Sequence, residues 1–276
     1  KENHYFINTN FYKNNNYLDR YYNKKDIVNK RVGFSHANML HCDYCPERII
    51  RHNNSAKLIV ILREPISRAF SAYRYAVKNS REKEANSFEE ALALEEKRMM
   101  FGSESRERRD LCYFENSKYH KHLKNYLNWF NKKQIFICTI CELEEDPEKL
   151  INKISCFLDI EACKVDYSQG KQNTRGEVKS KLIQKLLFNN QTEFRRLVLK
   201  SLPSSLINII KKIKLIIYNL NLTESSQKES ISKEMKNKLE VYFQDDLSRL
   251  KNEFGISLLQ EPSLKADEPF KQNNLI

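Results

Sequence analysis

Aliphatic runs and amphipathic segments alternate over the first 160 residues of this chain. The apolar runs predict strands at 30–35, 56–62 and 134–140. The run at 56–62 carries aliphatic side chains at successive positions, which is typical of a strand buried on both faces. Apolar residues at helical spacing predict helices at 46–53, 65–79, 87–100, 115–130 and 146–160. Strands separated by helices indicate a parallel sheet covered by helices.

Short local motifs predict where two of these helices begin and where a loop lies. Ser87 with Glu90 forms a predicted capping box, and Asp146 is placed as the N-cap of the helix after it. The charged stretch at 101–112 is predicted to be an exposed loop.

The last third of the chain shows helical patterns only, at 178–200, 203–220 and 231–254. The apolar run at 206–220 is interrupted by three lysines, so we expect no membrane span in this chain. We interpret this run as an amphipathic helix facing the core, with a helix on a membrane surface as the alternative. Residues 1–260 are then predicted to form one domain, followed by a flexible tail at 261–276.

The charge balance indicates an anionic partner. The formal net charge is +12, and residues 171–216 carry eleven Lys or Arg against two acids, so nine of the twelve net charges lie there. A nucleic acid, a phosphorylated cofactor, an acidic glycan and a membrane surface all fit such a charge. No helix–turn–helix, zinc-finger or RNP-type signature is present, so nucleic acid is not expected as a partner.

Seven cysteines form no dense disulfide framework. Cys42-x-x-Cys45 and Cys138-x-x-Cys141 have the spacing of metal or redox pairs, but the second pair overlaps a predicted strand, where an offset of three turns the side chains to opposite faces. We therefore expect free thiols in a reducing compartment and no metal.

Arg63 stands at the end of the predicted strand 56–62, and Pro65 opens the next helix. Ligands of parallel α/β sheets bind at this end of the strands, where helix N–H groups and the helix dipole suit a phosphate. Ser71 follows two turns into that helix. The alternative is an ion pair from Arg63 to a neighbouring carboxylate beside a surface serine.

The stretch "LREPISRAFSAYRY" resembles the 3′-phosphate-binding segment of sulfotransferases that use 3′-phosphoadenosine-5′-phosphosulfate (PAPS). The resemblance implies that Arg63 and Ser71 hold the 3′-phosphate; Arg68 and Tyr73 match the pattern without an assigned role. Residues 117–160 are similar to the family's helix–strand–helix segment, and "KENHYF" resembles a segment of its heparan-sulfate and bacterial carbohydrate branch. The implied fold is the α/β, P-loop-NTPase-like sulfotransferase fold, with a central parallel sheet flanked by helices.

The resemblance implies transfer of a sulfuryl group from PAPS to a hydroxyl or amine of a carbohydrate-type acceptor. Glu2 falls on the family's general base, and His4 on a position in the acceptor site. From the charge distribution, Lys171 and Arg175 are further candidates for contact with the donor's phosphates. A solvated helical face and contact with an anionic acceptor are the alternatives for this basic region. The implied compartment is a bacterial-like cytoplasm, with a Golgi lumen and a removed anchor as the alternative.

The sequence departs from the family's pattern in two places that affect function. The 5′-phosphosulfate loop, a strand followed by Lys-x-Gly-Thr-Thr, is absent from these residues, which implies an N-terminally incomplete domain. We expect this chain to transfer sulfate weakly or not at all, and a catalytically impaired remnant that binds the nucleotide is the alternative. In the second place, Phe34-Ser35-His36-Ala37 replaces Glu-Lys-Thr-Pro. That His36 takes over part of the role of the missing lysine is a hypothesis.

Overall fold

A computed structural model of the chain describes residues 3–14, 17–18, 30–162, 176–178, 222–224 and 231–258, with single positions between 203 and 220. It divides into two compact units, each considered by itself below. The first consists of Lys1–Arg68, Asn116–Ala162 and Leu239–Ile276, and the second of Ala69–Glu115 and Cys163–Lys238. One domain over 1–260 therefore stays a prediction. The predicted tail, and the predicted helix at 178–200 beyond Val178, lie outside the described residues.

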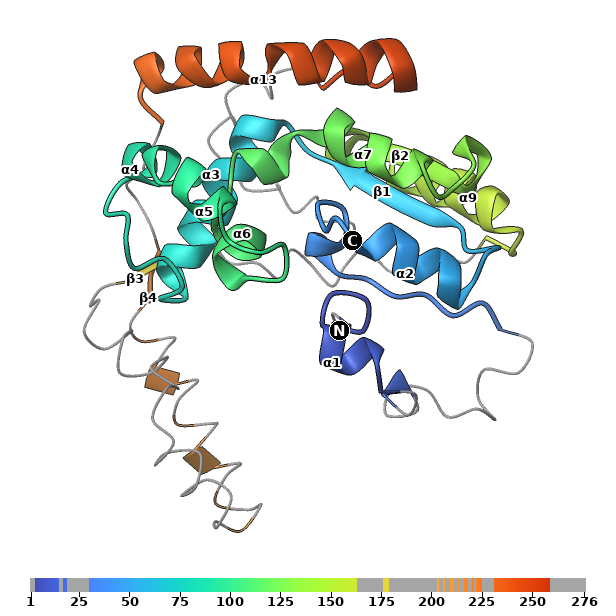
Figure 1. Cartoon of the computed structure of the whole chain (residues 1–276), viewed down its shortest axis with the longest axis horizontal. Coiled ribbons are helices and arrows are strands. Elements are labelled where there is room, and N and C mark those ends of the chain that lie inside the picture. Colours follow the sequence, from blue (N-terminus) through green and yellow to red (C-terminus); the bar gives the residue numbers. More distant parts are fainter. Residues whose placement is uncertain are drawn as a thin grey trace, which may run out of the picture. The chain divides into compact units, whose positions relative to one another are not determined.

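The first unit contains the predicted parallel pair of strands (Figure 1). Strand β1 (Leu58–Leu62) pairs with β2 (Ile135–Thr139) in parallel, from Leu58 opposite Ile135 to Leu62 opposite Thr139. The predicted strand at 30–35 is wrong, because these residues form neither helix nor strand. The carbonyl of Ser35 instead accepts a hydrogen bond from the backbone N–H of Asn3 at 3.0 Å, which joins this segment to the N-terminal turn rather than to the sheet.

Only one face of β1 is buried. Leu62 lies in the core with Val60 packed beside it, whereas Ile59 and Ile61 are 38% and 47% exposed. The prediction of a strand buried on both faces is therefore wrong. On the face of Ile59, helix α9 (Pro147–Leu158) covers the neighbouring strand, where the rings of Phe157 and Phe136 lie 5.4 Å apart.

Helices α2 (Cys45–His52) and α7 (Tyr119–Leu127) supply the core around the sheet. Ile49 of α2 packs with Tyr126, and Leu123 of α7 packs with Leu62. The described part of this unit also contains α1 (Thr9–Tyr12), α8 (Ile140–Glu145), the 3-10 turns η2 (Ala37–Met39) and η4 (Lys132–Gln134), the start of α3 (Pro65–Lys78), the 3-10 turn η3 (Glu115–Ser117) from Asn116 onward, and the part of α13 (Lys233–Phe254) from Leu239 onward. The predicted N-cap Asp146 is confirmed, since its carboxylate accepts from the N–H of Lys149 at 2.9 Å.

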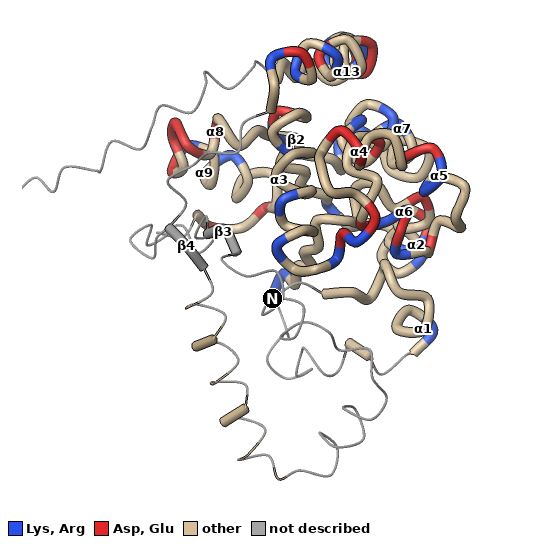
Figure 2. Tube along the Cα trace, turned by 90° about the vertical axis from the view of Figure 1, so that its left-hand side faces the viewer, with Lys and Arg blue, Asp and Glu red and all other residues tan. Residues whose placement is uncertain are grey.

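The second unit contains α4 (Phe88–Ala93), α5 (Glu95–Met99), α6 (Arg106–Leu111) and the part of α3 (Pro65–Lys78) from Ala69 onward. The predicted helix at 87–100 is interrupted at Leu94, and Ser87 caps its start as predicted. The capping box is not formed, because the carboxylate of Glu90 accepts from the N–H of Asn86 rather than from that of Ser87. The predicted loop at 101–112 contains α6, which Ser105 caps. Acidic and basic residues both occur along α5 and α6 (Figure 2).

Two further strands of the second unit, β3 (Gly176–Val178) and β4 (Leu222–Glu224), pair antiparallel, so the prediction of helices only is wrong there. The described positions of the apolar run are helical, and each is at least 39% exposed; they are Leu206, Ile209, Ile210, Ile213, Ile216, Ile217 and Leu220. The interpretation of this run as a helix that faces the core is therefore wrong at the described positions. Within the described part of the chain, no helix is long and apolar enough to cross a membrane.

Candidate active site

Arg63 lies directly after β1, at the carboxyl end of the parallel pair. Its carbonyl oxygen accepts a hydrogen bond from the hydroxyl of Tyr119 at 2.8 Å. Tyr119 is buried at the start of α7, and burial raises the pKa of its hydroxyl to about 12. Because the neutral hydroxyl stays a donor, it fixes the backbone from which the half-buried Arg63 side chain projects.

The start of α3 has no free N–H group to offer a phosphate. The carboxylate of Glu64 accepts from the N–H of Ile66 at 2.9 Å and of Ser67 at 2.6 Å. The N–H of Arg68 donates to the Glu64 carbonyl, and Pro65 has no N–H. The expectation that these N–H groups bind the phosphate is therefore wrong, and the positive charge at this strand end comes from the arginine side chain.

The other residues of the motif fall into different roles. Ser71 is exposed on α3. It belongs to the second unit whereas Arg63 belongs to the first, so their convergence on one anion stays a prediction. Arg68 donates to the hydroxyl of Ser117 at 3.1 Å, which ties the start of α3 to the segment before α7. Tyr73 is buried against the rings of Phe88 and Tyr113 and is a core residue of the second unit.

A pair of histidines forms the second candidate location in the first unit. Nε2 of His36 lies 2.9 Å from Nδ1 of His4, and the two rings meet edge to face with centroids 4.4 Å apart. His4 is exposed, and His36 is partly buried. Glu2, Lys171 and Arg175 lie outside the described residues.

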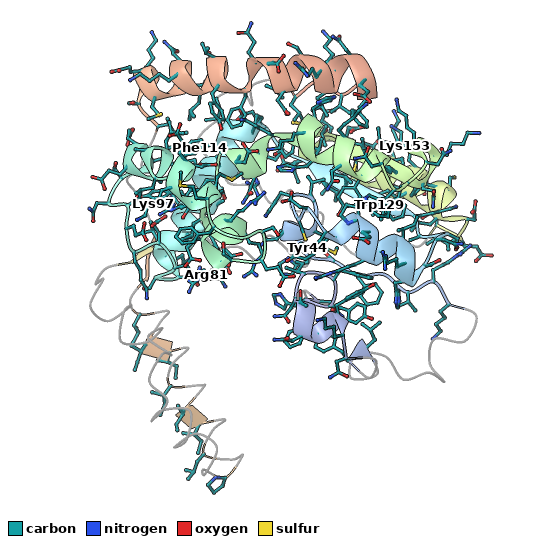
Figure 3. The ribbon with its side chains drawn as sticks, viewed as in Figure 1. Tyr44, Arg81, Lys97, Phe114, Trp129 and Lys153 are labelled. Carbon is teal, nitrogen blue, oxygen red and sulfur yellow. The ribbon has the colours of Figure 1, made fainter. Side chains whose placement is uncertain are left out.

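Helix α2 holds the backbone that follows His4. Arg48 donates to the carbonyl of Phe6 at 2.9 Å and to the hydroxyl of Thr9 at 2.6 Å. The hydroxyl of Tyr44, at the start of α2 (Figure 3), donates to the carbonyl of Ile7 at 2.7 Å. The Arg48 guanidinium also lies over the Tyr44 ring, 4.0 Å from its centroid. These contacts could not be predicted from the sequence, in which an arginine on an amphipathic helix is their local signal.

The Cys42–Cys45 pair lies beside this segment and is buried. Burial raises the pKa of the Cys45 thiol, whereas hydrogen bonds from Cys45 and Tyr44 outweigh burial at Cys42 and lower its pKa. All six cysteines that the structure describes are free thiols, as expected. Among the described residues, no cluster of three or more His, Cys, Asp or Glu is arranged to hold a metal ion.

Comparison with known proteins identifies the family. Residues 15–251 match the family model described as the sulfotransferase domain. The chain belongs to the sulfotransferase family. It is 29% identical over 132 residues to heparan sulfate glucosamine 3-O-sulfotransferase 5 of Mus musculus and 28% identical to that of Homo sapiens. Each match covers 48% of this chain and 36% of the relative, so the chain spans about a third of the length of these relatives.

A solved structure supports the fold. The crystal structure of a sulfotransferase from Alicyclobacillus acidocaldarius is similar with a TM-score of 0.57 and 19% sequence identity, over 91% of this chain and 82% of that one. The predicted fold class, an α/β sulfotransferase fold with a parallel sheet flanked by helices, is confirmed.

Proposed function

We propose that this member of the sulfotransferase family transfers a sulfuryl group from PAPS to a hydroxyl or amine of a carbohydrate-type acceptor. In this reaction the bond between sulfur and the bridging phosphate oxygen breaks, a new bond forms to the acceptor oxygen or nitrogen, and the acceptor's proton goes to a base. The main support for this proposal is the position of Arg63. It lies at the carboxyl end of a parallel strand, within a segment that resembles the family's 3′-phosphate site.

The donor end of the site requires groups that bind phosphate. The Arg63 guanidinium offers paired N–H donors for a phosphate, and the Tyr119 hydrogen bond holds its backbone in place. Because Glu64 occupies the N–H groups of α3, the arginine side chain supplies the binding energy on this side. Ser71, Lys171 and Arg175 are proposed as further contacts with the donor. PAPS supplies the activated sulfuryl group, and no metal is part of the proposal.

The acceptor end of the site requires a base, because a hydroxyl is a poor nucleophile until it loses its proton. We assign this role to Glu2, and we place His4 in the acceptor site. The hydrogen bonds from Arg48 and Tyr44 hold the segment directly after His4, which supports a defined acceptor site there. The names of the two mammalian relatives support a carbohydrate acceptor. A cytoplasmic location is proposed from the free thiols.

Calorimetry with adenosine 3′,5′-bisphosphate tests the donor site. Arg63→Ala should weaken binding by about 2 kcal/mol, roughly thirtyfold, because a charge-assisted contact is lost. Arg51→Ala is the matched control, since it removes the same charge from an exposed side chain of α2 that pairs with Glu47, and it should leave the affinity unchanged. Equal affinities of the Arg63→Ala variant and the parent would refute the assignment. Binding without transfer from labelled PAPS would favour the catalytically impaired remnant.

A further inference from the structure

The hydrogen bonds around His36 have a fixed direction. His36 is the N-cap of η2, and its Nδ1 accepts from the backbone N–H of Asn38 at 3.1 Å. A ring nitrogen that accepts an N–H bond carries no proton, so the proton of a neutral His36 is on Nε2. Nε2 lies 2.9 Å from Nδ1 of His4, and therefore His36 donates and His4 accepts.

The tautomer of His4 follows from that of His36. Because Nδ1 of His4 accepts from His36, the proton of a neutral His4 is on Nε2. A proton on Nδ1 of His4 would face the Nε2–H of His36 and break the pair. The arrangement therefore admits a single tautomer of His4, with a donor at the ring nitrogen that faces away from His36.

The backbone around the pair is held on both sides. The N–H of Asn3 donates to the carbonyl of Ser35 at 3.0 Å, which joins the residues that precede the two histidines. The carbonyl of His4 accepts from the N–H of Asn8 at 3.0 Å, and the side chain of Asn3 accepts from the N–H of Tyr5 at 2.8 Å. His4 is exposed on this turn, so its Nε2–H is available to a ligand.

We propose that His36 is a positioning residue that holds His4 as an Nε2–H donor for an oxygen of the acceptor. The partner group is a hydroxyl, carboxylate or sulfate oxygen of a carbohydrate. This inference rests on the proposed function for its ligand and on the described hydrogen bonds for the tautomer. His4 then binds and orients the acceptor, and it is not the base that takes the acceptor's proton.

Long-range ¹H–¹⁵N correlation spectra of the imidazole rings read the tautomer directly, without any need for activity. At an alkaline pH at which both rings are neutral, the parent should show His4 and His36 each as a single Nε2–H tautomer. His36→Gln should keep the His4 signature, because the glutamine amide replaces the Nε2–H donor. His36→Met has a similar length but no donor, and it should show His4 exchanging between tautomers. An Nδ1–H form of His4 in the parent, or identical His4 spectra of the two variants, would overturn the proposal.

Titration with a sulfated, heparin-derived disaccharide tests the ligand. The His4 Nε2–H resonance should move in the parent and in His36→Gln, and His36→Met should bind roughly threefold to tenfold more weakly. A His4 resonance that does not respond to the disaccharide would overturn the assignment of the acceptor oxygen. Calorimetry of the parent with adenosine 3′,5′-bisphosphate distinguishes a failure of this proposal from a failure of the proposed function. A parent that does not bind the nucleotide would count against the proposed function, whereas the tautomer of His4 would still be measured independently.

Discussion

Two buried glutamates of the second unit, Glu82 and Glu95, have pKa values shifted in opposite directions. Burial alone raises the pKa of Glu82, but hydrogen bonds from Arg98 and Tyr113, both at 2.7 Å, outweigh it and bring the pKa below its ordinary value. Glu95 accepts N–H bonds from Phe114 and Glu115, which do not compensate for burial, and its pKa rises to about 7. The two carboxylates therefore affect stability in different pH ranges.

Glu95 should make the second unit less stable as the pH rises. Its pKa is raised above the ordinary value of 4.5, so the folded chain holds the proton more tightly than the unfolded chain. Stability is then lost between pH 4.5 and 7, by roughly 2–3 kcal/mol in total. Urea unfolding followed by circular dichroism at several pH values measures this loss. Glu95→Gln should remove this slope, and the control Glu96→Gln, at an exposed position, should keep it. A parent whose stability does not fall over this range would contradict the argument.

Substitution of Glu2 by Gln tests whether Glu2 is the general base. The substitution keeps the size of the side chain but removes its ability to take a proton. In a longer chain that includes an upstream 5′-phosphosulfate loop, we expect the substitution to lower sulfuryl transfer by about a hundredfold or more, while the affinity for adenosine 3′,5′-bisphosphate stays nearly unchanged. The measurement is transfer from labelled PAPS to a carbohydrate acceptor, beside calorimetry on the same preparation. Full activity of the variant would remove Glu2 from the mechanism.

Helix α7 is capped by a residue from another element. No side chain of its own N-cap, Lys118, bonds to it. Instead, the buried carboxylate of Asp246 in α13 accepts from the N–H of His120 at 3.1 Å and of Lys121 at 3.2 Å. A carboxylate there satisfies two donors of the first turn and complements the positive end of the helix. Because α7 also carries Tyr119, this cap supports the helix that holds the Arg63 backbone.

Asp246→Ala should destabilise the first unit by about 1–2 kcal/mol, since two backbone donors lose their acceptor in a buried place. Asp245→Ala is the matched control in the same helix. Asp245 is exposed and pairs with Arg249 one turn later, so its loss should cost at most about 0.5 kcal/mol. The fluorescence of Trp129, the only tryptophan of the chain, reports urea unfolding of this unit. Similar losses in the two variants would argue against a capping role.

The whole molecule carries its positive charge unevenly. Nine of the twelve net charges belong to residues 171–216, whose Lys and Arg side chains lie outside the described residues. In contrast, the described helices α5 and α6 carry residues of both signs. Such a concentration of one sign attracts anionic ligands and is weakened by salt. We interpret it as the part of the chain that attracts the donor's phosphates or an anionic acceptor.

Elution from immobilised heparin tests this interpretation. Neutralising five bases of that region should lower the salt concentration at which the chain elutes; the substitutions to Gln are at Lys179, Lys181, Lys185, Arg195 and Arg196. A control with the same change in net charge places five Gln substitutions elsewhere, at Lys83, Lys133, Lys149, Lys236 and Lys251. The control should elute at a higher salt concentration than the first variant. Equal elution of the two variants would show that net charge alone decides.

The sequence by itself determined the elements whose signals are local. The aliphatic run before Arg63, the helical period after Pro65 and the caps Ser87 and Asp146 all predicted what the structure shows. The α8 cap was missed although its signal is equally local, since Thr139 and Glu142 form a capping box. Periodicity and capping involve residues only a few positions apart, so the sequence alone contains both partners of each interaction.

The tertiary structure alone decided which partners those elements found. Ile59 and Ile61 have the same aliphatic character as Leu62, yet only Leu62 meets the helices that bury it. Asp246 caps a helix more than a hundred residues away, and His36 meets His4 across 32 positions. Such contacts depend on where the folded backbone brings two distant segments together. The local sequence of either segment does not indicate which other segment it will contact. For that reason the position of Arg63 at the end of its strand was predictable, whereas the hydrogen bond between His36 and His4 was not.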